Sequence, residues 1–287
     1  MSGLMNFNRE YRLSAGQAGK QGFEIGHKSL QQPVPLHIAF SLQKADLQTP
    51  NTGKVTIWNL NKAHLAVLDE KDCVLSLRAG YGTHMPLIFA GTVSFATTTD
   101  DGADRKTEIE VVDSIIAIRD TYVSVSYNGR VSWERIFDDV AAQMGVAISY
   151  SYNAPSQFKN VMNGFSFVGK ARDVLTRGCN SCNLAWSVQN GVLQIKRPKD
   201  VMSKEVYVLS PDNGLIGTPA RVIEEDDAGG KSQGWDVEYF LNGAINIDDY
   251  VRLESKTATG YFRVYSIELQ GDNIAGDWLC KARLLEV

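Results

Sequence analysis

Apolar and polar residues alternate with a period of two through much of the first third of the chain. The first such run occupies alternate positions from Leu36 to Leu42. Alternation of this kind places every second side chain on one face of a half-buried strand. It predicts a β-barrel or sandwich over about residues 36–125, interrupted by one short helix at about Lys62–Leu68, where apolar residues recur at helical spacing.

A hairpin is predicted within this β region. The apolar segments 87–95 and 107–112 flank Thr99–Asp104, a connection rich in aspartate. Gly102 lies in this connection and can adopt the positive φ that closes a tight turn.

The periodicity changes from that of a strand to that of a helix at Ser132. A group of apolar residues then falls on one face of an amphipathic helix. They are Trp133, Ile136, Phe137, Val140, Ala141 and Met144. Ser132 is suited to be the N-cap of this helix and Gly145 to be its C-terminal stop.

The segment after this helix completes a small α+β unit. Residues 146–152 have a strand pattern, and a second helical stripe begins near Gly169. Asn190-Gly191 lies between two alternating segments, which is the strongest short-range signal for a hairpin. Pro198 ends the unit. The residues of the second stripe are Ala171, Val174, Leu175, Gly178, Cys179 and Cys182.

Strand patterns return after about Lys199, joined by loops rich in Gly, Asp and Asn. The predicted strands are 206–209, 233–240, 250–254, 260–270 and 278–283. The acidic run Glu224–Asp227 is expected to form a mobile, solvated loop between strands. The predicted fold is therefore mainly β with an α+β insert. Two β-barrel or sandwich domains, at residues 1–130 and 199–287, flank a small helix-containing domain at 131–198.

The composition is that of an ordinary globular protein. The chain has 287 residues, of which 44% are hydrophobic, and this length suits two or three domains. The net charge of -4 and the lack of a Lys/Arg run disfavour stable binding to DNA or to a membrane surface. The first twelve residues lack the apolar region of a signal peptide, and no stretch approaches the roughly 18 apolar residues of a membrane span. We therefore expect folding in a cytoplasm, without membrane insertion.

Cysteine and histidine offer weak candidates for metal or redox chemistry. Cys179 and Cys182 have the CxxC spacing of a metal or redox site. Both also continue an apolar helical stripe, so we expect them to pack in a core as reduced thiols. His64 and His84 have no recognisable spacing to a nucleophile or a carboxylate, and they are expected on the surface or in loops.

Other catalytic and ligand-binding patterns are weak or missing. Asp100, Asp101 and Asp104 could attract a hard cation, but their spacing does not fit an EF-hand, and a solvated turn is expected. The sequence lacks a P-loop, a GxSxG elbow, an HExxH helix and a GxGxxG loop after a strand. We expect no enzymatic activity, no catalytic residues, no metal and no cofactor.

The most informative motifs lie in the last third of the chain. Residues 210–219 read SPDNGLIGTP, and residues 241–253 read LNGAINIDDYVRL. GYFRVY at 260–265 and the segment from Gly271 to Trp278 follow them. Together these motifs resemble the closing domain of phage tail baseplate hub proteins.

Earlier segments resemble the N-terminal barrel of the same family. These are Ile57–Leu60, Arg78–Gly82 and Leu87–Val93, which occur in the same order. The chain departs from the family pattern at Asn242-Gly243-Ala244, where relatives tend to have Asn-Pro, and at residues 247–249, where relatives favour a Gly before Asp. These departures concern the conformation of one loop.

The resemblance implies a structural virion protein. Hubs of this family are homotrimers in which each chain contributes two tube-like β domains, so that three chains match the six-fold tail tube on one face and the three-fold spike on the other. The implied partners are the tail tube or distal tail protein, the central spike or tail-tip protein, and the tape measure protein. DNA would pass through the channel without specific binding. The implied location is the tail baseplate of the virion, with assembly in the host cytoplasm.

Two other functions stay open. The insert, about Val131–Arg197, has the size and the mixture of elements of small peptidoglycan-binding domains, which suggests a cell-wall-binding or cell-wall-degrading tail module. Trp58, Trp235 and Trp278 could provide stacking platforms in a tail-tip carbohydrate-binding protein. Their neighbours indicate that all three indoles point inward, which would leave no platform for a sugar.

Overall fold

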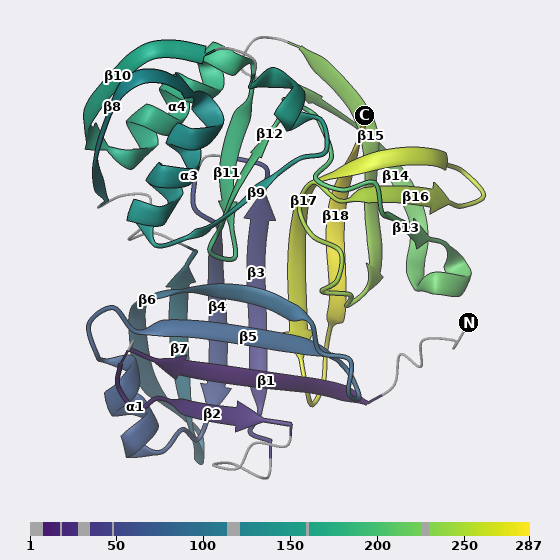
Figure 1. The fold of residues 1–287 in the computed structure, drawn as a ribbon. Helices are drawn as coiled ribbons and strands as arrows, with labels where there is room; N and C mark the ends of the chain where they lie inside the picture. Colours follow the sequence, from purple (N-terminus) through teal and green to yellow (C-terminus); the bar gives the residue numbers. More distant parts are fainter. Residues whose placement is uncertain are drawn as a thin grey trace.

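The structure is a computed structural model that describes residues 8–17, 19–27, 35–47, 49–113, 121–158, 161–225 and 230–287. The chain is mainly β, and a helix-containing insert separates two β units along the sequence (Figure 1). The predicted fold class is confirmed. Among the described residues, no helix is long and apolar enough to cross a membrane.

The first β unit contains the predicted alternating strands and the predicted short helix. Asn61 caps the helix, because its side-chain oxygen accepts a hydrogen bond from the backbone N–H of His64 at 2.8 Å. The elements are β1 (Arg9–Gly16), β2 (Phe23–Gly26), β3 (Ile38–Ala45), β4 (Thr52–Trp58), α1 (Lys62–Leu68), β5 (Val74–Tyr81), β6 (Leu87–Asp101) and β7 (Asp104–Val112).

The insert is an α+β unit with its own small sheets. Ser132 caps the first long helix through a bond from Arg135 N, and Gly145 ends the helix at a φ of 70°, as predicted. Asn190 and Gly191 both have positive φ, as a tight hairpin turn requires. The elements are β8 (Tyr122–Ser132), α3 (Trp133–Met144), β9 (Ala147–Tyr150), η1 (Ala154–Gln157), β10 (Val161–Lys170), α4 (Ala171–Cys182), β11 (Ala185–Gln189) and β12 (Val192–Lys196).

The second β unit closes the chain, and the strands predicted from the sequence lie close to their expected positions. Its elements are β13 (Val206–Leu209), η2 (Pro211–Asn213), β14 (Leu215–Glu225), β15 (Lys231–Phe240), β16 (Tyr250–Glu254), β17 (Thr259–Asp272) and β18 (Trp278–Glu286).

The two β units share one large sheet. Its strand order is β14-β15-β18-β17-β3-β4-β7-β6-β5-β1-β2, with β16 pairing with β17 and β13 pairing with β16. The junction is the antiparallel pairing of β17 with β3, in which Leu42 lies opposite Leu269. The sheet therefore runs without interruption from one β unit into the other.

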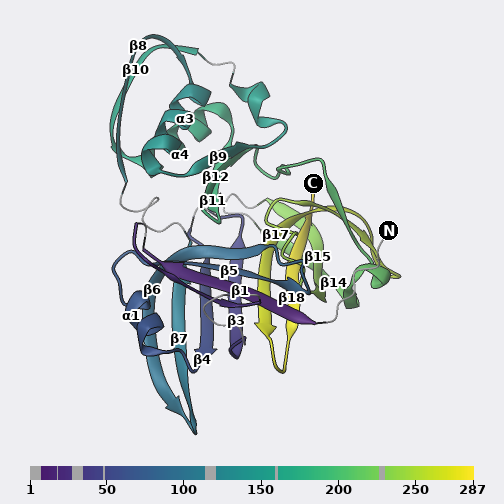
Figure 2. The same ribbon diagram turned by 60° about the horizontal axis from the view of Figure 1, so that its bottom comes forward.

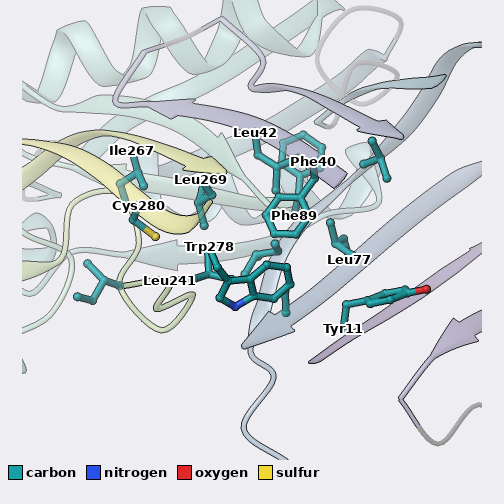
Figure 3. Packing of buried hydrophobic residues seen from close by; sticks show 14 of the residues in the cluster. Tyr11, Phe40, Leu42, Leu77, Phe89, Leu241, Ile267, Leu269, Trp278 and Cys280 are labelled. Atoms are coloured by element: carbon teal, nitrogen blue, oxygen red, sulfur yellow. The ribbon is translucent and has the colours of Figure 1, made fainter. Parts of the chain in front are cut away.

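One hydrophobic core also extends across both β units (Figure 3). Phe40 from β3 packs edge-to-face on Trp278 from β18, with ring centroids 5.3 Å apart. Gly271 lies beside this pair, and a Cβ at its position would meet the Phe40 ring at 2.2 Å. A glycine is therefore required where β17 passes the Phe40 ring.

The insert has a second core of its own, formed by the apolar stripes of α3 and α4 and by the strands around them. Val123 and Val125 from β8 belong to this core, although residues up to 130 were expected in the first β unit. The β8–β10 ribbon wraps over the helices, so β8 packs with the insert from Tyr122 onward.

Several strands were not predicted from the sequence, namely β1, β2, β10 and β14. The expectation of a loop at the acidic run was wrong for its first half, since Glu224 and Glu225 are the last residues of β14. Cross-strand pairing with β15 places Glu224 opposite Ser232 and overrides the low strand propensity of the carboxylates. Asp226 and Asp227 lie outside the described residues.

Both cysteines of the CxxC segment are buried in the second core. Cys179 is 2% exposed and Cys182 is 4% exposed, as the apolar stripe predicted. Burial raises the pKa of the Cys179 thiol to about 12, which keeps the sulfur protonated at neutral pH.

Replacing Cys179 and Cys182 together by Ala should lower the free energy of unfolding by about 1–3 kcal/mol, because two buried sulfur atoms are lost from a packed core. Urea denaturation gives the value, and Ser181→Ala, on the exposed side of the same helix turn, is the control. Stoichiometric zinc in the purified protein, released by a chelator with unfolding, would contradict the packing role.

Asp249 is a partly buried carboxyl group in the loop before β16. Burial raises its pKa to about 6, although a hydrogen bond from Asn246 N, at 2.7 Å, acts in the opposite direction. An unfolded chain would have an Asp pKa of about 3.9. The native state therefore binds more protons than the unfolded state between about pH 4 and pH 6.

The contribution of Asp249 to stability is present below about pH 4 and is lost as the pH rises through about 6. Between pH 4.5 and pH 7 the loss of this contribution lowers the unfolding free energy of the wild-type protein by about 1–2 kcal/mol, and Asp249→Asn should lack this decrease. Denaturation of both proteins at both pH values measures it, with Asp212→Asn at an exposed site as the control. Identical pH dependence in Asp249→Asn and the wild-type protein would contradict the assignment.

Candidate functional site: the polar face of the shared sheet

Eight strands of the shared sheet, from β14 to β6 in the order β14-β15-β18-β17-β3-β4-β7-β6, have one face on the core and one face that is polar. The alternation along the strands creates this division. Leu42 and Leu269 are buried, whereas Gln43 and Glu268, one position along each strand, lie on the opposite face. We call that opposite surface the polar face.

Polar side chains continue across the strand junction between the β units. Glu238 lies opposite Lys281, Lys281 lies opposite Glu268, and Glu268 lies opposite Gln43. Residues directly opposite on one face of an antiparallel pair are close enough to interact. The row therefore alternates acidic, basic, acidic and neutral side chains, and it belongs to both β units.

A groove of about 730 Å³ crosses the polar face at this junction. The row just described lies in its floor. Leu47 and Pro50, from the loop between β3 and β4, line the groove together with Ile216 and Thr218 of β14. The groove is thus lined by mixed charges and by a few apolar side chains.

Carboxylates flank the cations of the polar face. Arg283 donates to Asp236 at 2.9 Å and to Glu224 at 2.6 Å. These hydrogen bonds, to Asp236 first, raise the pKa of the guanidinium further above its usual range. Glu224, expected in a solvated loop, is therefore one side of an ion-pair bridge on this face.

A second group of ion pairs lies on β4 and β7. Lys54 and Lys106 both contact Glu108, at 2.7 and 2.6 Å. Hydrogen bonds from Lys106 and Lys54 lower the pKa of Glu108 to about 2. Glu108 therefore neutralises part of the positive charge of the two lysines, which reduces their attraction for an external anion.

The histidines are not grouped into a site. His64 lies on α1 and is buried against the Phe23 ring at a centroid distance of 4.3 Å, so the expectation of a surface position was wrong. Burial lowers the pKa of its imidazole. His84 is exposed near the turn between β5 and β6. Among the described residues, no group of three or more His, Cys, Asp and Glu side chains could hold a metal ion.

The aspartates of the β6–β7 hairpin form a solvated turn, as predicted, and they make local contacts. Asp101 accepts a hydrogen bond from Trp58 Nε1 at 2.9 Å, and Asp104 accepts one from Asn59 at 2.9 Å. These contacts hold the turn end of the hairpin against the end of β4.

The three tryptophans considered as sugar platforms differ in burial. Trp278 is 3% exposed in the first core. Trp235 is partly buried against the same core. Trp58 is partly buried, and one face of its indole is covered by the His37 ring at a centroid distance of 3.8 Å.

The chain matches no protein-family model and no curated protein sequence. It is similar in structure to the 43 kDa tail protein of prophage MuSo2 from Shewanella oneidensis, with a TM-score of 0.62 and 9% identity. That match covers 97% of this chain and 100% of the other. It is also similar to a tail protein from Neisseria meningitidis MC58, with a TM-score of 0.62, 10% identity and coverage of 98% and 97%.

A third similar structure is the E. coli c3393 protein, described as a type VI secretion system component with structural similarity to the T4 bacteriophage tail proteins gp27 and gp5. The TM-score is 0.58 at 7% identity, and the match covers 88% of this chain and 74% of the other. The fold is thus shared by proteins with very different sequences. The chain has the hub-like fold of phage tail and baseplate proteins, as the sequence resemblance predicted.

Proposed function

We propose that the chain is a structural protein of a phage or phage-like tail, and that three copies form a ring at the baseplate hub. One observation carries the proposal: a single sheet crosses both β units, and among the described residues two of its strands have an unpaired edge, β14 at one end of the sheet and β6 in the half that lies beyond its pairing with β5. Three chains with two β units each would present six similar units to a six-fold tail tube. The same ring would present three-fold symmetry to a spike or tail tip.

The unpaired edges of β14 and β6 are both open to pairing with a strand of another chain. Among the described strands, β14 pairs only with β15, and the second half of β6, from Phe95 to Asp101, pairs only with β7. An exposed strand edge favours pairing with another chain. Because the two edges belong to different strands, their contact would be head-to-tail, and such contacts close into a ring when the rotation permits.

Each edge carries an exposed apolar side chain, Phe95 on β6 and Ile223 on β14. Phe95→Lys combined with Ile223→Lys should reduce incorporation of the chain into assembled tails by roughly tenfold, because two charges would have to be desolvated at the new interface. Quantitative mass spectrometry of purified tails measures this.

Val168→Lys is the matched control, since Val168 is exposed on the insert and lies away from both edges. Equal incorporation of the edge variant and the control, with both proteins folded, would contradict the ring contact.

The polar face would line the channel of this ring. DNA passing through a channel is a polyanion, and accumulated phosphate contacts would hold it back. Carboxylates paired with Arg283, Lys54 and Lys106 support a lining that does not retain DNA. The partners would be the tail tube or distal tail protein, the spike or tail-tip protein, and the tape measure protein, and the protein would be located in the virion tail after assembly in the host cytoplasm.

Removing the paired carboxylates should create affinity for DNA. The variant Glu108→Gln, Glu224→Gln, Asp236→Asn should bind duplex DNA at low salt roughly tenfold more tightly than the wild type, because three phosphate contacts become available. Fluorescence anisotropy with a labelled duplex measures the affinity, and ejection from reconstituted virions should be slower.

The control variant has the same change in net charge at three other exposed positions, through Glu134→Gln, Asp173→Asn and Asp212→Asn. If the control gains as much affinity as the polar-face variant, the local pairing of charges has no special role.

The structural role is proposed without enzymatic activity or a cofactor. Burial of Trp278 and partial burial of Trp58 and Trp235 give the carbohydrate-binding alternative little support. Measurable affinity of the purified protein for peptidoglycan would favour the cell-wall alternative.

A further inference from the structure

The insert reaches the two β units through the β11–β12 hairpin, whose strands are its nearest elements to them in both views (Figures 1 and 2). At the hairpin tip, the N–H groups of Asn190 and Gly191 donate to the Asp113 carboxylate at 2.6 and 3.2 Å. Gln189, the residue before the tip, accepts from Asn51 Nδ2 at 2.8 Å and donates to the carbonyl of Ala45 at 3.0 Å. The tip is therefore bound to the first β unit by polar groups.

At the far end of the same hairpin, four charged side chains form a buried ring. Lys196 Nζ lies 2.7 Å from Asp46 and 2.5 Å from Asp248. Arg263 Nη1 contacts the same two carboxylates at 2.5 and 2.6 Å. Lys196 belongs to the insert, Asp46 follows β3 of the first β unit, and Asp248 and Arg263 belong to the second β unit.

The insert and both β units therefore contribute side chains to one ring in which positive and negative charges alternate. Lys196 and Asp248 are 1% and 0% exposed. A buried charge is stable only while its partners remain, because removing one leaves another desolvated without compensation. The ring therefore makes docking of the insert depend on all four side chains.

Among the described residues, the buried hydrophobic cluster of the insert is separate from that of the β units, and the two have no residue in common. The insert should therefore keep its own core when it separates from the β units, in contrast to β strands that share a core.

A short segment that contains Val201 joins the insert to the second β unit. Asp200 is held on the insert side, since its carboxylate accepts from Asn153 at 3.1 Å. Met202 is held on the other side, since its N–H donates to the Asp248 carbonyl at 3.0 Å. One residue thus separates a contact with the insert from a contact with the β unit.

We propose that the insert is a latched arm: the Asp46–Lys196–Asp248–Arg263 ring is the latch, and opening it lets the folded insert swing away from the β units about Val201. The inference rests on contacts within one chain and does not depend on the proposed ring of three copies. The buried charges then have a conformational role: they hold the insert docked on the β units and prevent it from swinging away.

Hydrogen exchange of the full-length protein tests the latch. Lys196→Met should accelerate exchange of the hairpin-tip amides, Asn190 and Gly191, by roughly 100-fold, because they are protected by Asp113 only while the insert is docked. Amides of α3 should exchange as in the wild type, since the second core stays intact. Arg135→Gln is the control, because it removes a cation from an exposed ion pair of the insert.

Two results would overturn the proposal. One is unchanged exchange at the hairpin tip; the other is acceleration of the tip and of α3 together, which would show that the ring supports folding of the insert. If Lys196→Met does not fold, Lys196→Met combined with Asp248→Asn restores the charge balance of Asp46 with Arg263. This double variant should show the same acceleration at the tip while α3 stays protected, and protection of both regions at the wild-type level would contradict the latch.

Discussion

The pairing of β3 with β17 is the constraint on which the rest of the structure depends. Seven residue pairs, from Ala39 with Asp272 to Ala45 with Ser266, join strands that are more than 200 positions apart in the sequence. Side chains alternate between the two faces of a strand, so this register decides which residues enter the core. A shift of β17 by one position relative to β3 would move Leu269 to the polar face and Glu268 toward the core. The shared core, the groove and the continuous polar face all follow from the observed register.

Local elements could be predicted from the sequence because their signals lie within a few residues. Ser132, the apolar stripe and Gly145 together specify α3, and Asn190-Gly191 specifies the β11–β12 turn. The pairing of β3 with β17 has no such signal, since any alternating strand could be its partner. The same holds for β10, where Phe165 and Phe167 alternate over a short segment whose partner, β8, lies beyond α3.

The candidate site was less predictable than the fold. A strand pattern predicts that one face is polar, but the order of strands decides which polar residues become neighbours. Glu224, Asp236 and Arg283 form one ion-pair bridge only because β14, β15 and β18 are adjacent. The buried ring around Lys196 could not be anticipated either, since its four members come from three chain units. The motifs in the last third predicted the hub-like fold through resemblance, and most of them are turns and inward strand residues.

We propose, as the central claim, that this fold builds a ring by joining β14 of one chain to β6 of the next. Electron cryomicroscopy of the assembled tail tests that claim most directly, because it gives the copy number and the strand contacts together. We expect three copies of the chain around the tail axis, β14 beside β6 of the neighbouring copy, and the polar face toward the channel. One or six copies per ring, or a polar face turned to the outside, would contradict the account.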